Sequence, residues 1–262
     1  MIYNVHAGHN AEGKVACGAV GLIKESTEAR KVTERVIELL KEKGHTVYDC
    51  TVNNGISQSD VLSKIVKKCN AHKVNLDVSI HFNAGRNDKK GDGSTGGTEV
   101  LVYDANSKAM DEAVRICNKL SKLGLRNRGV KTRKDLYFLR KTKSPSLLIE
   151  VAFVDDADDV AVYDCDKVAK AIVEGILNTT LTTKKSEEQK SITTSSARKT
   201  PFKVKVITKE LNIRKDAGTE NKIVGKITDK GTYTINKVSG SWGHLVSNTG
   251  WINISTKYVK YI

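Results

Sequence analysis

Hydrophobic positions recur with two different periods along the first 178 residues. Short apolar runs typical of strands alternate with longer segments in which apolar residues return every three or four positions, as on one face of a helix. The expected strands are Ile2–Val5, Thr46–Cys50, Leu76–Phe82, Thr98–Tyr103 and Leu147–Phe153. The expected helices are Glu28–Lys43, Val61–Cys69, Ala109–Leu120 and a last one that Asp166 caps and Ile176 ends. This alternation predicts a three-layer α/β/α domain with a mostly parallel sheet.

The pattern changes after residue 178. Residues 179–202 are dominated by Thr, Ser and Lys, a composition typical of a solvated linker. Residues 203–262 show short alternating strands separated by turn sequences such as Asp-Ala-Gly and Asp-Lys-Gly. This spacing predicts a small all-β barrel. We therefore expect an α/β domain at 1–178, a linker at 179–202 and a barrel at 203–262.

The charge is strongly positive and uneven. The chain has 44 Lys and Arg residues against 30 Asp and Glu, a formal net charge of +14. Residues 203–262 alone have 11 Lys and Arg against 4 Asp and Glu. An anionic partner is expected, and nucleic acid, a membrane or a phosphate-bearing cell wall each fits the charge.

Four polar residues lie inside or at the ends of the apolar segments. His81 follows Leu-Asp-Val-Ser-Ile, and Glu150 interrupts Leu-Leu-Ile-Glu-Val-Ala-Phe. His9 comes just after the first expected strand, and Glu25 just before the first expected helix. An imidazole or carboxylate in such surroundings loses hydration and needs a partner, such as a metal ion. Two His and one Glu suit Zn²⁺ with an open position for a nucleophilic water, which leaves the second Glu as proton carrier.

Three positions leave alternatives open. His6 can replace His9 as the first ligand, although the Gly-His-Asn context favours His9 and only one of the two is expected to face the cleft. Glu28 cannot be separated from Glu25 by spacing alone, because either carboxylate also suits the start of a helix. Cys17 is an alternative ligand, although a small buried thiol is the favoured interpretation.

Four motifs, in this order, resemble a known family: Gly-His-Asn, a Glu at the first helix, Ser-Ile-His-Phe-Asn-Ala and Leu-Ile-Glu-Val-Ala-Phe. They look like the zinc-dependent N-acetylmuramoyl-L-alanine amidases of the third type, which include many bacteriophage endolysins and cell-wall or spore amidases. The resemblance covers about residues 1–178 and implies cleavage of the amide between N-acetylmuramic acid and L-alanine of peptidoglycan. It implies His9, Glu25 and His81 as zinc ligands and Glu150 as the catalytic glutamate.

The resemblance also favours Glu25 over Glu28, because the family's glutamate precedes the long helical run. The sequence departs from the family pattern near the first implied ligand, His9. Family members often read Asp-x-Gly-His-Gly, whereas this chain reads His-Ala-Gly-His-Asn, so that His6 occupies the acidic position.

Residues 203–262 are similar to bacterial SH3-type wall-binding modules. Leu-Asn-Ile-Arg-Lys-Asp-Ala-Gly matches their opening strand and turn, and the segments around Trp242 and Trp251 match their late strands. Each Trp either stacks on sugar or peptide or packs in the core, and both interpretations stay open. The Lys excess would draw such a module toward an anionic wall polymer.

Two other functions were weighed against a wall amidase. A zinc carboxypeptidase-like wall peptidase would use the same residue types, but it needs His-x-x-Glu where this chain has His6-x-x-His9. A basic nucleic-acid-binding protein would explain the charge, but aromatic residues make up only 5% of the chain and no nucleic-acid motif is present. The expected partners are therefore peptidoglycan and anionic wall polymer of a Gram-positive host, with no nucleic acid and no membrane; the oligomeric state stays open.

The cysteines and the first residues indicate a compartment. Five cysteines without a CxxC pair are not a disulfide framework and favour synthesis in a reducing compartment. Met-Ile-Tyr-Asn-Val-His has neither the basic start nor the apolar core of a signal peptide. We expect a protein without a signal peptide that accumulates in the host cytoplasm and acts at the cell wall after release.

Overall fold

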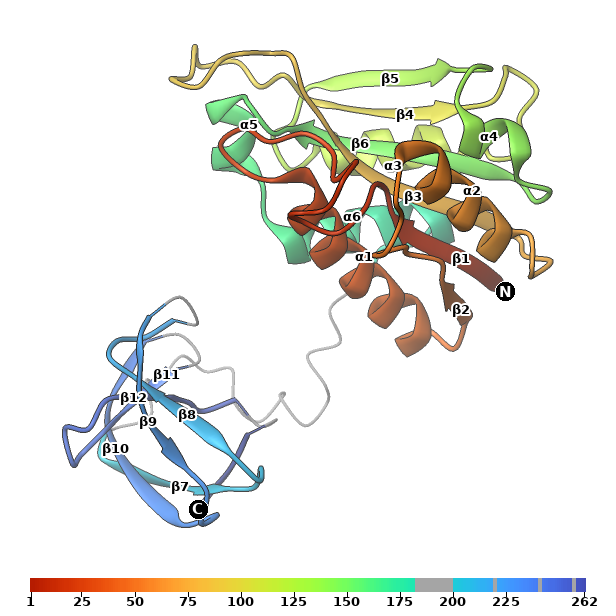
Figure 1. Ribbon diagram of the computed structural model, residues 1–262. Coiled ribbons are helices and arrows are strands. Elements are labelled where there is room, and N and C mark those ends of the chain that lie inside the picture. Colours follow the sequence, from red (N-terminus) through yellow and green to blue (C-terminus); the bar gives the residue numbers. More distant parts are fainter. Residues whose placement is uncertain (182–199, 219–220, 240–241, 256–257) are drawn as a thin grey trace. The chain divides into compact units, whose positions relative to one another are not determined.

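The computed structural model describes residues 1–181, 200–218, 221–239, 242–255 and 258–262. Contacts divide the chain into two units, Met1–Thr182 and Thr183–Ile262, which Figure 1 shows as an α/β body and a β body. Most of the linker expected at 179–202 lies outside the described residues, so the expected domain boundaries stay a prediction.

The first unit contains each strand and helix that the hydrophobic pattern predicts, together with three short elements that it does not. In chain order the elements are β1 (Ile2–Ala7), α1 (Glu25–Glu42), β2 (Thr46–Asp49), α2 (Gln58–Cys69), β3 (Leu76–Asn83), β4 (Thr98–Val102), α3 (Met110–Ser121), β5 (Asn127–Thr132), α4 (Tyr137–Lys141), β6 (Ser146–Phe153), α5 (Ala157–Val162) and α6 (Cys165–Leu177). The unpredicted β5, α4 and α5 are short and carry too few apolar residues to show a period.

The helix ends differ from the expectation by up to three residues, and two of these differences concern acidic residues at a helix start. Helix α1 begins at Glu25 rather than Glu28, so Glu25 is its first residue. The cap of α6 is Asp164, whose side chain accepts a hydrogen bond from the Lys167 amide, and not Asp166. Asp164 and Asp166 are both residue types that cap helices, so the residue type alone does not choose between them. The backbone geometry of the turn does.

Six strands of the described first unit form one sheet in the order β2-β1-β3-β6-β4-β5. The pairs β1–β2, β1–β3, β3–β6 and β4–β5 are parallel, and β4–β6 is antiparallel. The mostly parallel sheet is thus confirmed, with the difference that β4 and β5 run opposite to the other four strands. This reversal places the start of β4 beside the end of β6.

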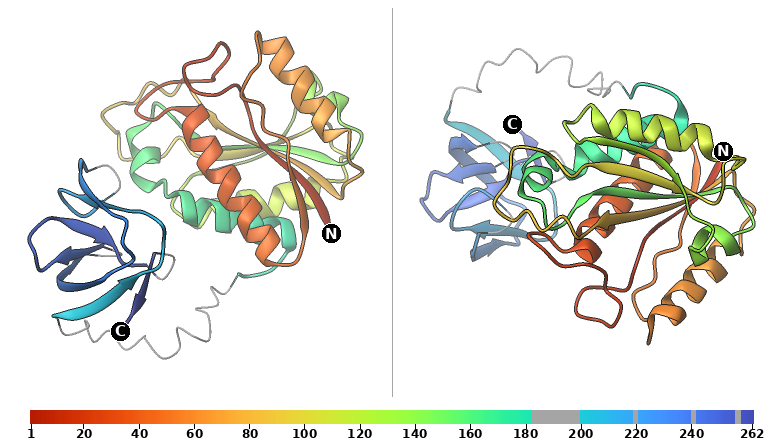
Figure 2. Two further views of the ribbon diagram at one scale, coloured as in Figure 1. Left: turned by 60° about the horizontal axis from the view of Figure 1, so that its bottom comes forward. Right: turned by 90° about the horizontal axis from the view of Figure 1, so that it is seen from above.

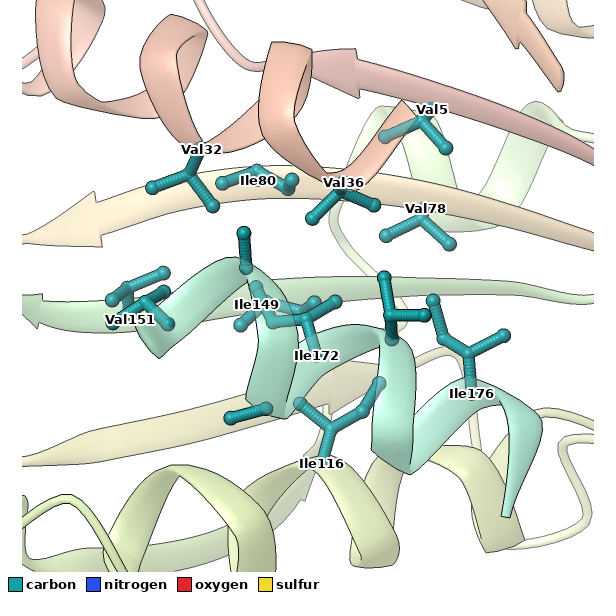
Figure 3. Close-up of a cluster of buried hydrophobic side chains, with 14 of the residues drawn as sticks. Val5, Val32, Val36, Val78, Ile80, Ile116, Ile149, Val151, Ile172 and Ile176 are labelled. Atoms are coloured by element: carbon teal, nitrogen blue, oxygen red, sulfur yellow. The ribbon is translucent and has the colours of Figure 1, made fainter. Parts of the chain in front are cut away.

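Helices cover both faces of this sheet (Figure 2). On one face α1, α3 and α6 pack on a large apolar core in which Val5, Val36, Ile80 and Ile149 meet Ile172 (Figure 3). On the other face α2 and α4 enclose a smaller core that includes side chains from the same strands. Strand residues alternate between the two cores, as the period of two predicts.

The second unit is built from antiparallel strands in its described parts. These are β7 (Phe202–Val206), β8 (Leu211–Arg214), β9 (Ile223–Ile227), β10 (Thr232–Ser239), β11 (Trp242–Leu245), β12 (Trp251–Asn253) and β13 (Val259–Tyr261), in the sheet order β13-β7-β10-β11-β12-β8-β9. They surround an apolar core that contains Val204, Ile235 and Ile252. A small all-β domain is therefore present, and its SH3-type identity stays a prediction. No helix in the described residues has the length and apolar character needed to cross a membrane.

Candidate metal and catalytic site

The loop after β1 presents His9 with its backbone in the left-handed region, at φ 61°. A residue other than glycine keeps this conformation only where its surroundings fix it. Arg30 of α1 donates a guanidinium hydrogen bond to the His9 carbonyl oxygen at 3.2 Å. The buried Asn10 side chain donates to the carbonyl oxygens of Val15 and Gly55 at 3.0 and 2.7 Å. These contacts hold the His9 imidazole in place although it lies outside any helix or strand.

His81 extends from β3 across the backbone of the neighbouring strand. The Gly8 amide donates to the Ile80 carbonyl oxygen at 2.9 Å and so continues the pairing of β1 with β3. A Cβ atom at residue 8 would lie 2.0 Å from His81 Cε1 and 2.1 Å from His81 Nε2. Only glycine leaves room for the imidazole, so the Gly of Gly-His-Asn serves the histidine of the adjacent strand.

The Glu25 carboxylate lies between the two imidazoles. Its Oε1 is 3.0 Å from His81 Nδ1 and 3.3 Å from His9 Nε2. The backbone amides of Phe82 and Ala19 also donate to this carboxylate, at 3.1 and 2.8 Å. Burial raises the pKa of Glu25, but the hydrogen bonds from His81 and His9 outweigh it and hold the pKa below its usual range. Glu25 is therefore ionised at neutral pH.

These three residues could hold a metal ion together. One donor atom from each of His9, Glu25 and His81 lies within 4.8 Å of the other two. Burial lowers the pKa of His81, which favours the neutral imidazole that metal binding requires. The backbone makes room for the group, because a Cβ at Gly18 would lie 2.5 Å from Glu25 Oε2. Two imidazoles and one carboxylate fit a divalent ion with an open position.

The structure separates the alternatives that spacing left open. Glu28 lies on α1 but pairs with Lys31 and accepts a hydrogen bond from the Tyr163 hydroxyl, away from the two imidazoles. Neither His6 nor Cys17 belongs to the group of donor atoms that meet.

Glu150 projects from β6 directly beside His81, its register partner on β3. Its Oε2 atom is buried and finds no hydrogen-bond partner in the described parts of the chain. Burial, and after it the carboxylates of Glu25 and Glu99, raise the pKa of Glu150 to about 8, against the opposing effect of Arg133. A buried carboxyl without a partner is costly for the fold, and such groups concentrate at functional sites.

A cavity of about 320 Å³ opens beside this group. Its lining includes His9, His81, Glu150 and Arg133, together with apolar side chains of α2, α4 and the sheet. His6 also lines it, so the expectation that only one of His6 and His9 faces the cleft was wrong. The imidazoles of His6 and His9 thus line the same cavity, His6 from β1 and His9 from the loop after it.

Sequence reasoning missed Glu99 and Arg133. Glu99 is the register partner of Glu150 on the reversed strand β4, and it binds Arg128 and Asn83 at 3.0 and 3.1 Å. The signal was the same as for Glu150, a Glu within an apolar strand. Arg133 follows the unpredicted strand β5, so no pattern marked it.

The two Trp residues of the second unit differ in their surroundings. Trp251 is 8% exposed and contacts the His244 ring edge-on, which favours a packing role. Trp242 is half-buried and lines a hollow of about 210 Å³ together with Arg214 and Tyr258. Trp242 is therefore the better candidate for ligand contact.

Two His and one Glu that could hold a metal ion, with a second Glu lining the same cavity, are an arrangement that suits metal-assisted hydrolysis on a three-layer α/β domain. The comparison with known families agrees. Residues 4–180 match the family model described as N-acetylmuramoyl-L-alanine amidase, and the chain belongs to this family.

Relatives and solved structures support the assignment. An uncharacterized protein of Clostridium perfringens is 39% identical over 178 residues, 66% of this chain and 50% of that protein. The endolysin of Bacillus phage SPP1 is 29% identical, over 64% of this chain and 60% of its own length. The catalytic domain of an endolysin targeting Clostridia Difficile superposes with a TM-score of 0.61 at 26% identity, over 69% of this chain and 99% of that domain. The chain spans about half the length of the first curated relatives it matches.

Proposed function

We propose that this protein is a peptidoglycan hydrolase that cleaves the amide between N-acetylmuramic acid and L-alanine. The observation that carries the proposal is the meeting of His9, Glu25 and His81 beside the unpaired carboxyl of Glu150. Family membership supports the identity of the scissile bond. The alternatives, a zinc carboxypeptidase-like peptidase and a nucleic-acid-binding protein, have no comparable support.

The metal we propose is zinc, held by His9 Nε2, His81 Nδ1 and the Glu25 carboxylate. A zinc ion in such a site supplies a Lewis acid for the substrate carbonyl and lowers the pKa of an attacking water. Glu25 is fixed by two backbone amides as well as by the imidazoles, so it keeps its position whichever substrate enters. Hydrogen bonds from surrounding groups to a metal-binding side chain commonly fix its orientation.

Glu150 would move the proton. Its Oε2 has no hydrogen-bond partner among the residues that the structure describes, and burial is the largest of the causes that raise its pKa to about 8. A group that titrates near neutral pH can accept a proton from the attacking water and return it to the leaving amine. The charged neighbours Glu25 and Arg133 act on it in opposite directions, which keeps the pKa in this range.

We further propose that the second unit is an SH3-type module for the wall of a Gram-positive host. Its supports are the all-antiparallel strands, the positive charge and the aromatic hollow at Trp242. An endolysin of a phage is among the relatives, which supports synthesis in the cytoplasm and action at the wall after release.

Digestion of purified Gram-positive peptidoglycan by the full chain tests the proposed function. We expect new N-terminal L-alanine without new reducing sugar, together with one zinc per chain. The appearance of D-amino acid ends instead would support the peptidase alternative. Steep loss of DNA binding with added salt, in a protein without stoichiometric zinc, would support the nucleic-acid alternative.

The loop glycines give a test of the metal site that does not depend on activity. In Gly18→Ala the new Cβ would lie 2.5 Å from Glu25 Oε2 and 2.9 Å from His9 Cδ2, so it must displace ligands. We expect zinc affinity to fall by roughly 10- to 100-fold, as when support of a ligand is lost. Gly13→Ala is the matched control, because Gly13 has nearly the same φ, 76° against 82°, and nothing within 4 Å. Equal zinc affinity of the two variants, measured by competition with a chelator, would contradict the proposed site.

A further inference from the structure

The cavity beside the proposed metal site has a polar floor. His6 on β1 and Ser79 on β3 are register partners, so their side chains stand next to each other on the same face of the sheet. Both line the cavity below the level of His81 and Glu150, which occupy the next outward positions on β3 and β6. The side chains around them, such as Ile65 of α2 and Phe138 of α4, are apolar.

These two floor residues have unused hydrogen-bonding atoms. His6 is 1% exposed and Ser79 is fully buried, yet His6 Nε2 and Ser79 Oγ find no partner within the described residues. A buried polar group without a partner costs free energy, and a native protein retains it where a partner arrives from outside. A ligand group that reaches the floor would give both His6 Nε2 and Ser79 Oγ a hydrogen-bond partner.

The hydrogen-bonding character of the floor follows from His6. Its Nδ1 lies 3.1 Å from the Ala7 carbonyl oxygen, so Nδ1 carries the proton. Burial lowers the pKa of His6 to about 3, so the ring is neutral and Nε2 offers a lone pair. The Ser79 hydroxyl is free to donate. The complement of one acceptor beside one donor is a group whose N–H and C=O lie on the same side, as in a primary carboxamide; in a trans secondary amide the two point in opposite directions.

We propose that this floor is a recognition subsite for an uncharged primary carboxamide carried on an apolar group. His6 Nε2 accepts a hydrogen bond from the amide N–H, and Ser79 Oγ donates one to the amide oxygen. The apolar walls contact the attached carbon atoms, and they give a charged group no compensation for lost hydration.

The inference rests on the proposed function for the identity of the ligand. The stem peptide of the proposed substrate offers such a group where its second residue is D-isoglutamine, whereas the acetamido group of the sugar is a secondary amide. Two cleavage products separate the two groups. The dipeptide L-Ala-D-isoglutamine carries the carboxamide, and N-acetylmuramic acid carries only the acetamido group.

The test measures binding of these two products to the full zinc-loaded chain by ligand-observed NMR titration. We expect L-Ala-D-isoglutamine to bind more weakly to Ser79→Ala and to His6→Asn by roughly 2- to 12-fold, the range for one neutral hydrogen bond. L-Ala-D-Glu keeps the peptide amide but has a carboxylate in place of the carboxamide, and its affinity should not change in Ser79→Ala. A loss confined to N-acetylmuramic acid would assign the floor to the sugar and overturn its assignment to a carboxamide.

Thr33→Val is the matched control, because Thr33 Oγ1 is also buried and unpartnered but does not line the cavity. Removing either hydroxyl leaves no group unpaired, so both variants should unfold at or above the wild-type temperature. Unchanged affinity of Ser79→Ala for both products, no binding of either product by the wild type, or an equal loss in Thr33→Val would overturn the proposal. Because product binding needs no turnover, these outcomes are distinct from a failure to digest peptidoglycan.

Discussion

Glu150→Gln is expected to lower kcat/KM for peptidoglycan hydrolysis by roughly 10²- to 10⁴-fold while zinc stays bound at full stoichiometry. The amide fills the same volume as the carboxyl, so neither the strand nor the cavity has to change. It cannot accept a proton, and this is the capacity that the unpaired, buried Oε2 of Glu150 provides. Release of N-terminal L-alanine measures the loss, and metal analysis of the same sample shows that the ligands are intact.

Glu99→Gln is the control for this prediction. Glu99 is the register partner of Glu150 and raises its pKa, but its own carboxylate is bound by Arg128 and Asn83. We expect an activity loss of less than about tenfold, because a positioned proton carrier contributes far more than a neighbouring charge. If Glu99→Gln were as inactive as Glu150→Gln, proton transfer could not be assigned to Glu150.

The period of two along the strands predicts which residues share a face, and the structure confirms it at the site. His81 and Ser79 face the smaller core while Val78 and Ile80 face the larger one, as the alternation indicates. The apolar run around Glu150 predicts a buried carboxyl, and its Oε2 is buried. These features are local, so the sequence is sufficient to predict them.

The pairing of strands and the course of loops are not local, and here prediction failed. The reversed direction of β4, which brings Glu99 against Glu150, depends on contacts between segments some fifty residues apart. Likewise, the spacing of Glu25 and Glu28 is equally good for a helix start. What separates them is that α1 begins at Glu25, where the Phe82 amide of another element donates to the carboxylate. Spacing and composition do not contain that contact, and from the sequence only the family resemblance favours Glu25.

His9→Asn is expected to abolish stoichiometric zinc binding. Loss of a group that only supports a metal ligand lowers metal affinity by up to about 100-fold, so removal of the ligand itself should lower zinc affinity by more than about 100-fold. Asn suits the position because it tolerates the left-handed backbone at φ 61°, so the loop is retained. His6→Asn is the matched control: it removes an imidazole of the same cavity that lies outside the donor group. We expect His6→Asn to keep one zinc per chain, whereas His9→Asn loses the zinc and the hydrolytic activity. Chelation of the wild type should reproduce the His9→Asn result, and added zinc should reverse it only in the wild type. The opposite pattern, with zinc lost from His6→Asn and retained by His9→Asn, would make His6 the ligand and would remove it from the floor of the substrate cavity.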